Sequence, residues 1–381
     1  MKKAFISICM IMVLLTGLLT GCRSGSVPDE EVVTDIERTR IGVSLWSSDD
    51  VMGSRCKDIL CETADVMGVE LVFEDNGLND VPGSVDRLID QGCRGIIVCS
   101  SAVDEMSDII KKCDESGVYV IQVFRRIDMD ESGETYAAAK ASRCYIGAVH
   151  EDEVENGRNV MDMLLEAGAR NIGVIGTKAD DGAWLDRYEG FKSSIDTWND
   201  TNKGDPAVLL EPRFGGVKHD GGSQAAAAII EASEADGLIC AGGGGEPLIG
   251  ALSYLEIEDR RAEVKVAAMD FVDDLGDRIK REEIIGASGG SYCDPMFALI
   301  LVGHAIESEE DFSDVVEDLT LPYIYVNSYN EFEEYSEYFD SELPYTDDEI
   351  AELLTLDTGG LTSKAKELSI DDAASRAQKR K

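Results

Sequence analysis

The chain has 381 residues, and its 76 Asp and Glu residues against 35 Lys and Arg residues give a formal net charge of −41 at pH 7. So acidic a surface excludes nucleic acid as a partner and disfavours adhesion to anionic lipid headgroups. Hydrophobic residues make up 44% of the chain, which is enough to fill two domain cores at this length.

The first residues have the pattern of an export signal. Two lysines precede an apolar run over residues 4–19, which is shorter than the stretch of about 20 residues that spans a membrane. The Leu-Thr-Gly-Cys sequence that ends at Cys22 resembles the bacterial lipobox, in which the cysteine sulfur receives a diacylglyceride. We therefore expect a lipoprotein signal peptide over residues 1–21, lipidation of Cys22, and a flexible polar tether over residues 22–40.

Cysteine and histidine usage limits the chemistry. Eight of the ten cysteines follow Cys22, and an even number in an exported protein permits disulfides. They have no CxxC spacing, however, and Cys99, Cys144 and Cys240 fall in apolar runs, where cysteine behaves as a small buried hydrophobe. We favour mostly free thiols, while the disulfide alternative stays open. The three histidines are far apart, which argues against a zinc cluster or a histidine-based triad.

From residue 40 onward, short apolar runs alternate with amphipathic segments. Strands are expected at 41–46, 69–73, 95–99, 118–123, 144–149, 171–175, 207–210, 237–241, 264–269, 284–287 and 323–326. Helices are expected at 51–67, 84–91, 103–116, 152–167 and 185–198. Glycines at 68, 92, 117 and 168 follow expected helices, as left-handed C-caps do.

This alternation predicts an α/β fold with parallel strands and crossover helices. The strands fall into two similar series, so we expect two doubly wound parallel-sheet lobes joined by a multi-strand hinge. The first lobe is assigned residues 41–148 plus 292–320, and the second residues 149–291 plus 321–356. Residues 357–381 lack a strong apolar face and are expected to form a frayed C-terminal tail.

Ligands of open parallel sheets bind beyond the carboxyl ends of the strands, so the residues that follow each strand are candidates. They include aromatic rings, which cover C–H faces, and arginines and carboxylates, which bind hydroxyls. A single such residue is more often a helix cap or a surface ion pair, and only the whole set indicates a polar, ring-shaped ligand. The candidate ligand-binding residues are Trp46, Asp50, Phe124, Arg125, Trp184, Arg187, Phe214, Asp270 and Ser291.

The glycine run at 242–245 has neither the GK[ST] ending of a P-loop nor the GxGxxG spacing of a dinucleotide site. Glu246 and Pro247 follow it, and a carboxylate would repel phosphate while proline suits the first turn of a helix. We interpret the run as a tight strand-to-helix turn.

In their order, these segments resemble the type I periplasmic binding proteins, in particular the ribose-binding and related sugar-binding members, over residues 40–330. Arg187-Tyr188-Glu189-Gly190-Phe191 matches the family's Arg-x-x-Gly-Phe. Weaker matches lie at Ile41–Trp46, Gln91–Val98, Val120–Arg125, Ile249–Leu252 and Val266–Asp270.

The resemblance implies roles for several candidates. Arg125 from the first lobe and Arg187 from the second would hydrogen-bond the ligand, and Asp270 would accept from its hydroxyls. Phe214 lies where the family places a stacking ring, and Ser291 where a Gln or Asn closes the site. Trp46 and Asp50 lie in the first loop, which carries polar and aromatic contacts in the family.

The sequence also departs from the family's pattern. Phe124 replaces the aspartate that precedes the first arginine, and Gly244-Gly245 replaces an Asn-Asp pair. These departures remove several contacts to sugar hydroxyls and leave the identity of the ligand open.

The resemblance implies a solute-binding lipoprotein of an ABC importer, which captures a sugar or a sugar-like molecule and presents it to a membrane permease. We expect a monomer without a cofactor, lipid-anchored to the extracytoplasmic face of the cell membrane in a Gram-positive cell. The alternative is a ligand-sensing module coupled to a membrane histidine kinase or chemoreceptor. An exported enzyme is disfavoured, because the sequence has no GxSxG elbow and no evident partners for its histidines.

Overall fold

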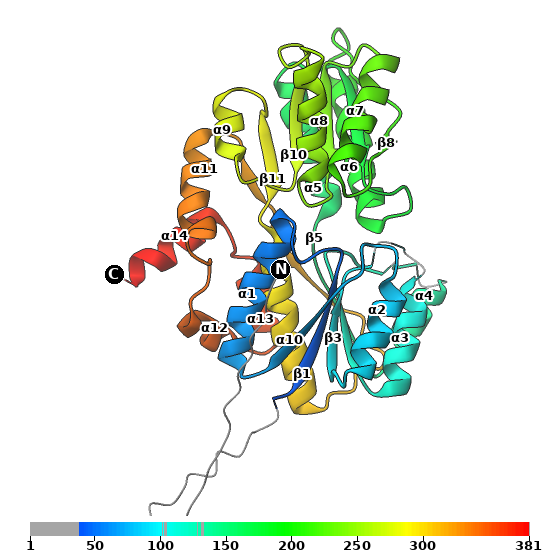
Figure 1. Cartoon of the computed structure of the whole chain (residues 1–381), viewed down its shortest axis with the longest axis vertical. Helices are drawn as coiled ribbons and strands as arrows, with labels where there is room; N and C mark the ends of the chain where they lie inside the picture. The colour runs from blue at the N-terminus through cyan, green and yellow to red at the C-terminus, as the bar shows by residue number, and fades with distance from the viewer. Residues whose placement is uncertain (1–37, 101, 103–104, 128, 131–132, 381) are drawn as a thin grey trace, which may run out of the picture. The chain divides into compact units, whose positions relative to one another are not determined.

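The computed structural model describes residues 38–380, except 101, 103–104, 128 and 131–132. The expected signal peptide, the lipidation site Cys22 and nearly all of the tether lie outside the described residues. Within the described part, the strands form two sheets, each covered by helices (Figure 1). The predicted α/β fold with two parallel-sheet lobes is confirmed.

The sheet of the first lobe has the strand order β12-β5-β4-β3-β1-β2, and neighbouring strands are parallel. Its strands are β1 (Arg40–Leu45), β2 (Glu70–Asp75), β3 (Gly95–Val98), β4 (Tyr119–Val123), β5 (Tyr145–Glu151) and β12 (Asp318–Leu321). Its helices are α1 (Val51–Met67), α2 (Val81–Asp90), α3 (Glu105–Ser116), α4 (Glu134–Ala141) and α10 (Asp294–Ser308). Strand β3 is buried along its whole length, which explains why its sequence is a continuous run of apolar residues.

The sheet of the second lobe has the order β13-β11-β10-β9-β6-β7, with β8 beside β6. Its strands are β6 (Asn171–Gly176), β7 (Val208–Leu209), β8 (Arg213–Phe214), β9 (Gly237–Ala241), β10 (Lys265–Met269), β11 (Gly286–Gly289) and β13 (Ile324–Val326). Its helices are α5 (Glu153–Glu166), α6 (Gly182–Thr201), α7 (His219–Ala232), α8 (Glu246–Ile257) and α9 (Leu275–Lys280). Only β13 is antiparallel to its neighbour in the described part of this sheet.

Strand β9 shows how this sheet is covered on both faces. Leu238 and Cys240 belong to the same buried cluster as α7 and α8, whereas Ile239 and Ala241 belong to the cluster that contains α5 and α6. Successive side chains of a strand point to opposite faces, so each face of β9 is buried under a different helix pair.

Helix ends follow the expected local signals. Gly68, Gly92, Gly117 and Gly168 all have positive φ angles, as predicted for residues that end a helix in the left-handed conformation. Asp50 and Asp181 start α1 and α6 as N-caps, each accepting a hydrogen bond from a backbone N–H group of the first turn.

The chain passes between the lobes in three segments of the described structure. One joins β5 to α5, the second joins β11 to α10 through η1 (Ser291–Cys293), and the third joins β12 to β13. Residues at these crossings therefore belong to a hinge as well as to the space between the lobes.

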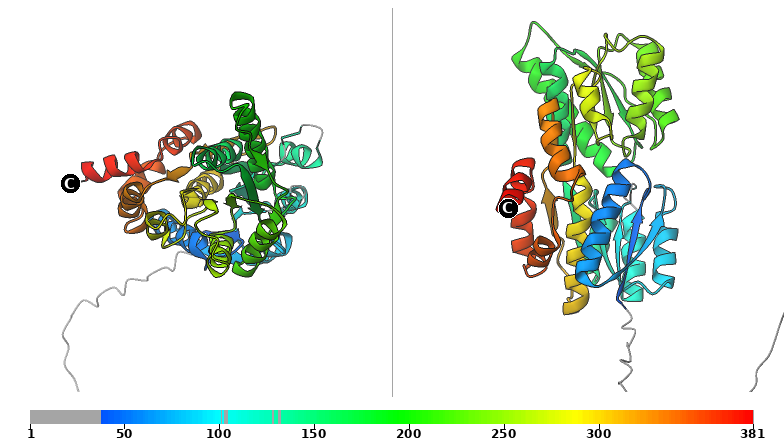
Figure 2. Two further views of the ribbon diagram at one scale, coloured as in Figure 1. Left: turned by 90° about the horizontal axis from the view of Figure 1, so that it is seen from above. Right: turned by 60° about the vertical axis from the view of Figure 1, so that its left-hand side comes forward.

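The C-terminal residues correct two expectations. Beyond β13 the chain forms α11 (Tyr329–Tyr335), η2 (Ser336–Asp340), α12 (Asp347–Leu353), α13 (Thr358–Ala365) and α14 (Ile370–Lys379), which gather on one side of the molecule (Figure 2). Helix α11 packs on α9 of the second lobe, but α12 packs on α1 of the first, so residues 321–356 do not all belong to the second lobe.

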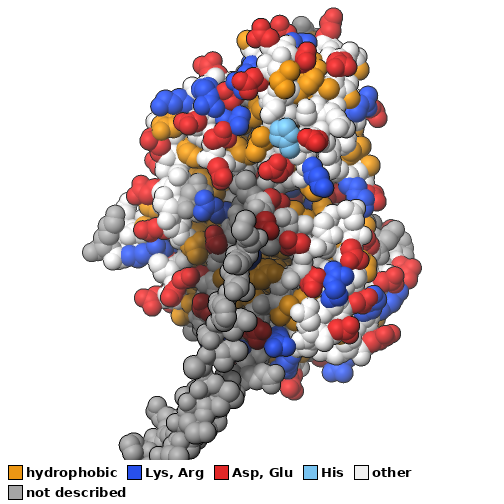
Figure 3. Space-filling view, in the orientation of Figure 1, with side chains coloured by type: hydrophobic (Ala, Val, Ile, Leu, Met, Phe, Trp, Pro, Cys, Tyr) orange, Lys and Arg blue, Asp and Glu red, His pale blue; other side chains and the backbone are white. Residues whose placement is uncertain are grey.

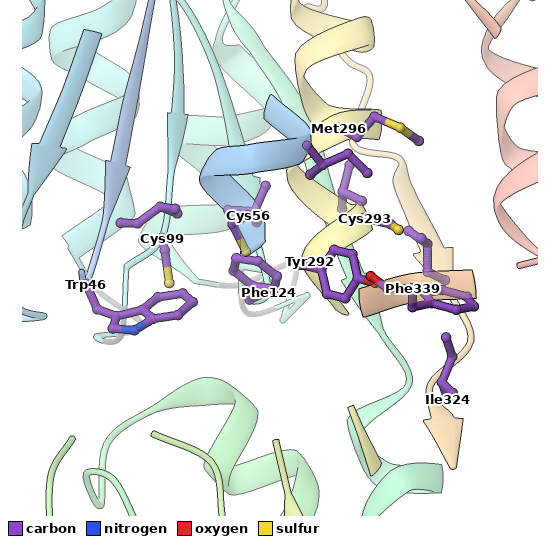
Figure 4. Close-up of a cluster of buried hydrophobic side chains, with 14 of the residues drawn as sticks. Trp46, Cys56, Cys99, Phe124, Tyr292, Cys293, Met296, Ile324 and Phe339 are labelled. Atoms are coloured by element: carbon purple, nitrogen blue, oxygen red, sulfur yellow. The ribbon is translucent and has the colours of Figure 1, made fainter. Parts of the chain in front are cut away.

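The expected frayed tail over 357–381 is also wrong for the described residues. Leu361, Ala365, Leu368 and Ala373 are buried. Leu361 and Ala365 lie one turn apart on α13, Leu368 lies between the two helices and Ala373 lies on α14, and all four belong to the main buried cluster. Further up this segment, the buried Phe339 ring packs edge-on against Tyr292 (Figure 4).

The described cysteines are all free and, except for Cys61, buried. Acidic side chains are spread over both lobes among Lys and Arg (Figure 3), as in a solvated surface. In the described part of the chain, we find no helix with the length and apolar character needed to cross a membrane.

Candidate ligand site

A cavity lies between the two lobes, where the carboxyl ends of their strands face each other. Its empty space, including the open mouth, is about 450 Å³. It is lined by Trp46, Met52, Leu78, Phe124, Arg125, Glu151, Glu153, Thr177, Arg187, Val217, Gly242, Gly243, Gly244, Asp270 and Tyr323.

The first lobe contributes an aromatic wall. The rings of Trp46, after β1, and Phe124, after β4, meet edge to face with their centroids 5.5 Å apart (Figure 4). Trp46 Nε1 donates to Asp50 Oδ2 at 2.5 Å, so its polar atom is already bonded and its ring presents apolar surface. Burial raises the pKa of Asp50, although the Gly53 N–H and the Trp46 N–H oppose this.

Arg125 joins this wall to the second lobe. Its Nε and Nη2 atoms donate to the Asp181 carboxylate at 3.2 and 2.7 Å. The side chains are only 12% and 1% exposed, so the pair is shielded from solvent. Burial lowers the pKa of Arg125, but the Asp181 carboxylate outweighs this and raises it overall. Both groups are therefore charged, and the bidentate geometry makes this a strong contact between the lobes.

Arg187 lies on α6 and is bonded within its own lobe. Its Nε and Nη2 atoms donate to Glu153 at 2.7 and 2.6 Å, and Nη1 donates to the Ala241 carbonyl at 3.1 Å. Nη2 also donates to the Tyr323 hydroxyl of the hinge at 3.0 Å. The guanidinium thus ties α5, α6, β9 and a crossing segment together at the floor of the cavity.

The glycine run forms the predicted turn between β9 and α8 and approaches the cavity closely. Gly242 and Gly244 have φ angles of 102° and 74°, which favour glycine. A Cβ at 242 would lie 2.6 Å from Arg187 Nη1, and one at 244 would lie 2.8 Å from Asp50 Oδ2. Glycine here lets the backbone of the second lobe contact both side chains.

Asp270 follows β10 and faces this turn. Among the described residues its carboxylate is bonded by one donor, the Gly244 N–H at 2.8 Å. Burial raises the pKa of Asp270 to about 6, against the opposing effects of Arg187 and the Gly244 N–H. Asp270 and Phe124 both have positive φ angles, of 94° and 61°, an uncommon conformation for such residues that is concentrated at functional sites.

The hinge adds a carboxyl pair. Asp294, at the start of α10, is fully buried. Burial, followed by the neighbouring Glu151 with which it shares a hydrogen bond, raises the pKa of Asp294 well above its usual range. The protonated form of Asp294 is therefore favoured, which reduces the negative charge of the hinge beside the cavity.

The structure brings most of the predicted residues together. Trp46, Phe124, Arg125, Arg187 and Asp270 line the cavity, and Asp50 lies directly behind Trp46.

Two predicted aromatic residues lie elsewhere. Trp184 is buried, stacks on Tyr188 and meets Phe214 edge to face at 5.1 Å. Both rings lie against Gly176, where any Cβ would be 2.7 Å from Trp184, and neither lines the cavity. Ser291 is the first residue of η1.

Several lining residues were not among the predicted site residues. Glu151 is the last residue of β5 and Glu153 the first residue of α5, so their position at a strand end was a usable signal. Tyr323 lies between β12 and β13, and nothing local marks it. Asp181 is recognisable only as a helix N-cap, because its partner Arg125 is 56 residues away. Among the described residues, no group of three or more His, Cys, Asp or Glu side chains is placed to hold a metal ion.

Comparison with known proteins gives the same architecture. Residues 41–292 match the model of a family described as periplasmic binding protein domain. A comparison of the sequence with curated proteins gave no match.

Solved structures with this fold are similar at low sequence identity. The Caulobacter myo-inositol binding protein, bound to myo-inositol, is 19% identical, with a TM-score of 0.64 over 77% of this chain and 95% of that chain. The periplasmic component of the arabinose ABC transporter from Shewanella sp. ANA-3, bound to L-arabinofuranose, is 16% identical, with a TM-score of 0.66 over 80% and 96%. A solute binding protein from Bacillus halodurans C-125 with bound myo-inositol is 19% identical, with a TM-score of 0.63 over 80% and 100%.

Proposed function

We propose, because the chain belongs to the periplasmic binding protein family, that it captures a sugar or a sugar-like polyol between its lobes and presents it to the permease of an ABC importer. The observation that carries this proposal is the cavity itself, whose lining comes from both lobes and from the hinge. A ligand held by both lobes stabilises their closed arrangement, and the closed form is what a permease would recognise.

The lining suits a polyol. Trp46 and Phe124 offer apolar surface to the C–H face of a ring, while Asp270 accepts hydrogen bonds. Solved proteins of this fold are described with myo-inositol, L-arabinofuranose and D-allose bound. No covalent step is required, so we propose a binding protein and not an enzyme.

Thermal unfolding tests the proposal. The purified protein is heated with pentoses, hexoses, cyclitols, amino sugars and nucleosides. Each compound is present at about 1 mM, because stabilisation by a ligand grows with the ratio of its concentration to its dissociation constant. We expect at least one polyol to raise the melting temperature by several degrees, because ligand binding to the folded state stabilises it. If none of these compounds changes the melting temperature, the proposed function is wrong.

We further propose that the protein is a monomer anchored through a lipid on Cys22 at the extracytoplasmic face of a Gram-positive membrane. The lipobox-like Leu-Thr-Gly-Cys sequence supports this. Metabolic labelling with radioactive palmitate should label the wild-type protein and leave Cys22→Ala unlabelled. Labelling of both proteins would contradict lipidation at this residue.

A further inference from the structure

Among the described residues, both arginines that line the cavity are already paired with carboxylates. Arg125 is occupied by Asp181 through two donors, and its Nη1 faces Cys99 Sγ at 3.6 Å. Arg187 is occupied by Glu153 through two donors, by Ala241 and by Tyr323. These side chains are the cavity-lining arginines of the described structure, so a carboxylate or phosphate group on the ligand would meet two guanidinium groups whose charges are already paired with Asp181 and Glu153.

The acidic groups, in contrast, are not all neutralised. Glu153 is paired with Arg187, and Glu151 belongs to the hinge carboxyl pair. Asp270 has no ion pair within 4 Å among the described residues and accepts from the Gly244 N–H alone. Asp50 lies behind the aromatic wall formed by Trp46 and Phe124. It likewise has no cationic partner in the described structure, and its hydrogen-bond donors are Trp46 and Gly53. The surplus charge on this side of the cavity is therefore negative.

The remaining lining favours a cation as well. Trp46 and Phe124 add two aromatic rings to the lining of the same cavity, and the negative faces of such rings attract ammonium groups, Trp most strongly. The rings of Trp46 and Phe124 and the unpaired carboxylate of Asp270 therefore suit a ligand that carries a positive charge and also has an apolar face.

We propose that the ligand is an aminated sugar or cyclitol whose protonated amine is received by Asp270, with Trp46 and Phe124 covering the ring. This inference rests on the proposed function, since it names the chemical class of the ligand for the same cavity. It predicts that the protein discriminates by charge at one position of the ring and not by ring size alone, because an ammonium group adds the Coulomb attraction of an ion pair to the hydrogen bond that a hydroxyl could also donate to Asp270.

Matched pairs of ligands test the inference by calorimetric titration at pH 7.5. The probes are glucose and glucosamine, galactose and galactosamine, mannose and mannosamine, and myo-inositol with an inosamine; glucuronate is the anionic probe. We expect at least one amine to bind about tenfold or more tightly than its neutral partner, and glucuronate not to bind.

The other outcomes separate the two proposals. If a neutral member binds as tightly as its amine or more tightly, the inference about the amine is wrong, while the proposed function stands. Tight glucuronate binding also overturns the inference, because it requires an arginine that the present pairs occupy. If no probe binds, both the inference and the polyol-binding function are wrong.

A pair of variants locates the charge that gives the preference. Asp270→Asn should reduce the affinity ratio of amine to neutral ligand to about one, because the amide keeps the shape of the carboxylate and removes its charge. Asp273→Asn is the matched control, since Asp273 is exposed, lies on the same loop and does not line the cavity. An equal loss of preference in both variants would overturn the assignment to Asp270, as would an unchanged preference in Asp270→Asn with an unchanged circular dichroism spectrum.

Discussion

The two arginine–carboxylate pairs of the cavity have similar geometry but different places in the fold. Arg187 and Glu153 both belong to the second lobe, on α6 and α5, and their side chains are 9% and 5% exposed. Arg125 belongs to the first lobe and its partner Asp181 to the second. The first pair is present whether or not the lobes approach each other, whereas the second exists only when they do.

The two pairs therefore have different expected roles, one in the stability of the second lobe and the other in the closure of the two lobes. The contact between Arg125 and Asp181 does not stand alone, because Arg126 bonds Asp186 at 3.0 Å and Ala102 forms a backbone bridge with Asp181. All three contacts join the loops after β3 and β4 to the start of α6. We therefore expect this edge of the cleft to control closure, and Arg187 to control the integrity of the second lobe.

Arg187→Ala should have the largest effect. It leaves the buried Glu153 without a counter-ion, and removing one partner of a buried pair costs about 3–5 kcal/mol. Urea unfolding measures this loss, with Arg158→Ala on the exposed side of α5 as the control, expected to change the free energy of unfolding by less than about 0.5 kcal/mol. Equal effects in the two variants would show that the Arg187 pair is not a structural part of the second lobe.

Arg125→Ala should act on closure. Separated lobes leave both groups in water, so the free energy of unfolding should change by less than about 1 kcal/mol. Ligand affinity should fall about tenfold, or about 1.4 kcal/mol, because the closed arrangement loses a buried contact. Small-angle X-ray scattering of the ligand-free protein should give a larger radius of gyration than for the wild type.

The scattering measurement distinguishes a closure contact from a ligand contact, since no ligand is present. Arg126→Ala is the comparison variant and should change the radius of gyration less than Arg125→Ala, because its pair with Asp186 is 36% and 28% exposed and exposed pairs contribute less than buried ones. A radius of gyration that is the same in Arg125→Ala and in the wild type would contradict the closure role.

The smallest expected effect is on the pH dependence of stability, to which Asp270 and Asp181 contribute with opposite signs. Burial raises the pKa of Asp270 to about 6 from its usual 3.8, in surroundings that include Arg187, the Gly244 N–H, Asp50 and Glu153. Its contribution to stability is therefore fully present below about pH 4 and is lost as the pH rises through about 6. Burial also acts to raise the pKa of Asp181, but Arg125 outweighs it and lowers the pKa overall, so its contribution is present above the usual pKa and is lost as the pH falls below it.

Urea midpoints of the wild type, Asp270→Asn and Asp181→Asn between pH 3 and pH 8, the range that brackets these ionisations, check the two signs. The midpoint of the wild type relative to Asp270→Asn should fall as the pH rises. Relative to Asp181→Asn, it should fall as the pH decreases. The same slope for both comparisons would contradict the distinction between a paired and an unpaired acid.

Much of the fold was predictable because its signals are local. Helix α1 was predicted with its observed bounds, Val51–Met67, and the buried strands were marked by continuous apolar runs. Arg125, Arg187 and Asp270 line the cavity, and they were candidates because parallel strands end at one edge of a sheet. The apolar positions of α13 and α14 were also present in the sequence, but they are too few to form a strong apolar face, so the segment was expected to be a frayed tail.

The rest depends on contacts between distant segments. Whether an arginine is free for a ligand depends on partners 56 and 34 residues away, at Asp181 and Glu153. The loops of Trp184 and Phe214 lie at the right strand ends, yet the missing side chain of Gly176 lets these rings pack on each other away from the cavity. Packing of this kind has no local sequence signal, so position at a strand end was necessary but not sufficient.

The most direct test of the central claim is a crystal structure of the protein with the ligand that binds most tightly in the calorimetric titrations. The account predicts that the ligand lies between the lobes, with its ring against Trp46 and Phe124, and that Asp270 accepts a hydrogen bond from it while Arg125 remains bonded to Asp181. A ligand bound outside this cavity, or one bound with the lobes apart and Arg125 separated from Asp181, would contradict the account.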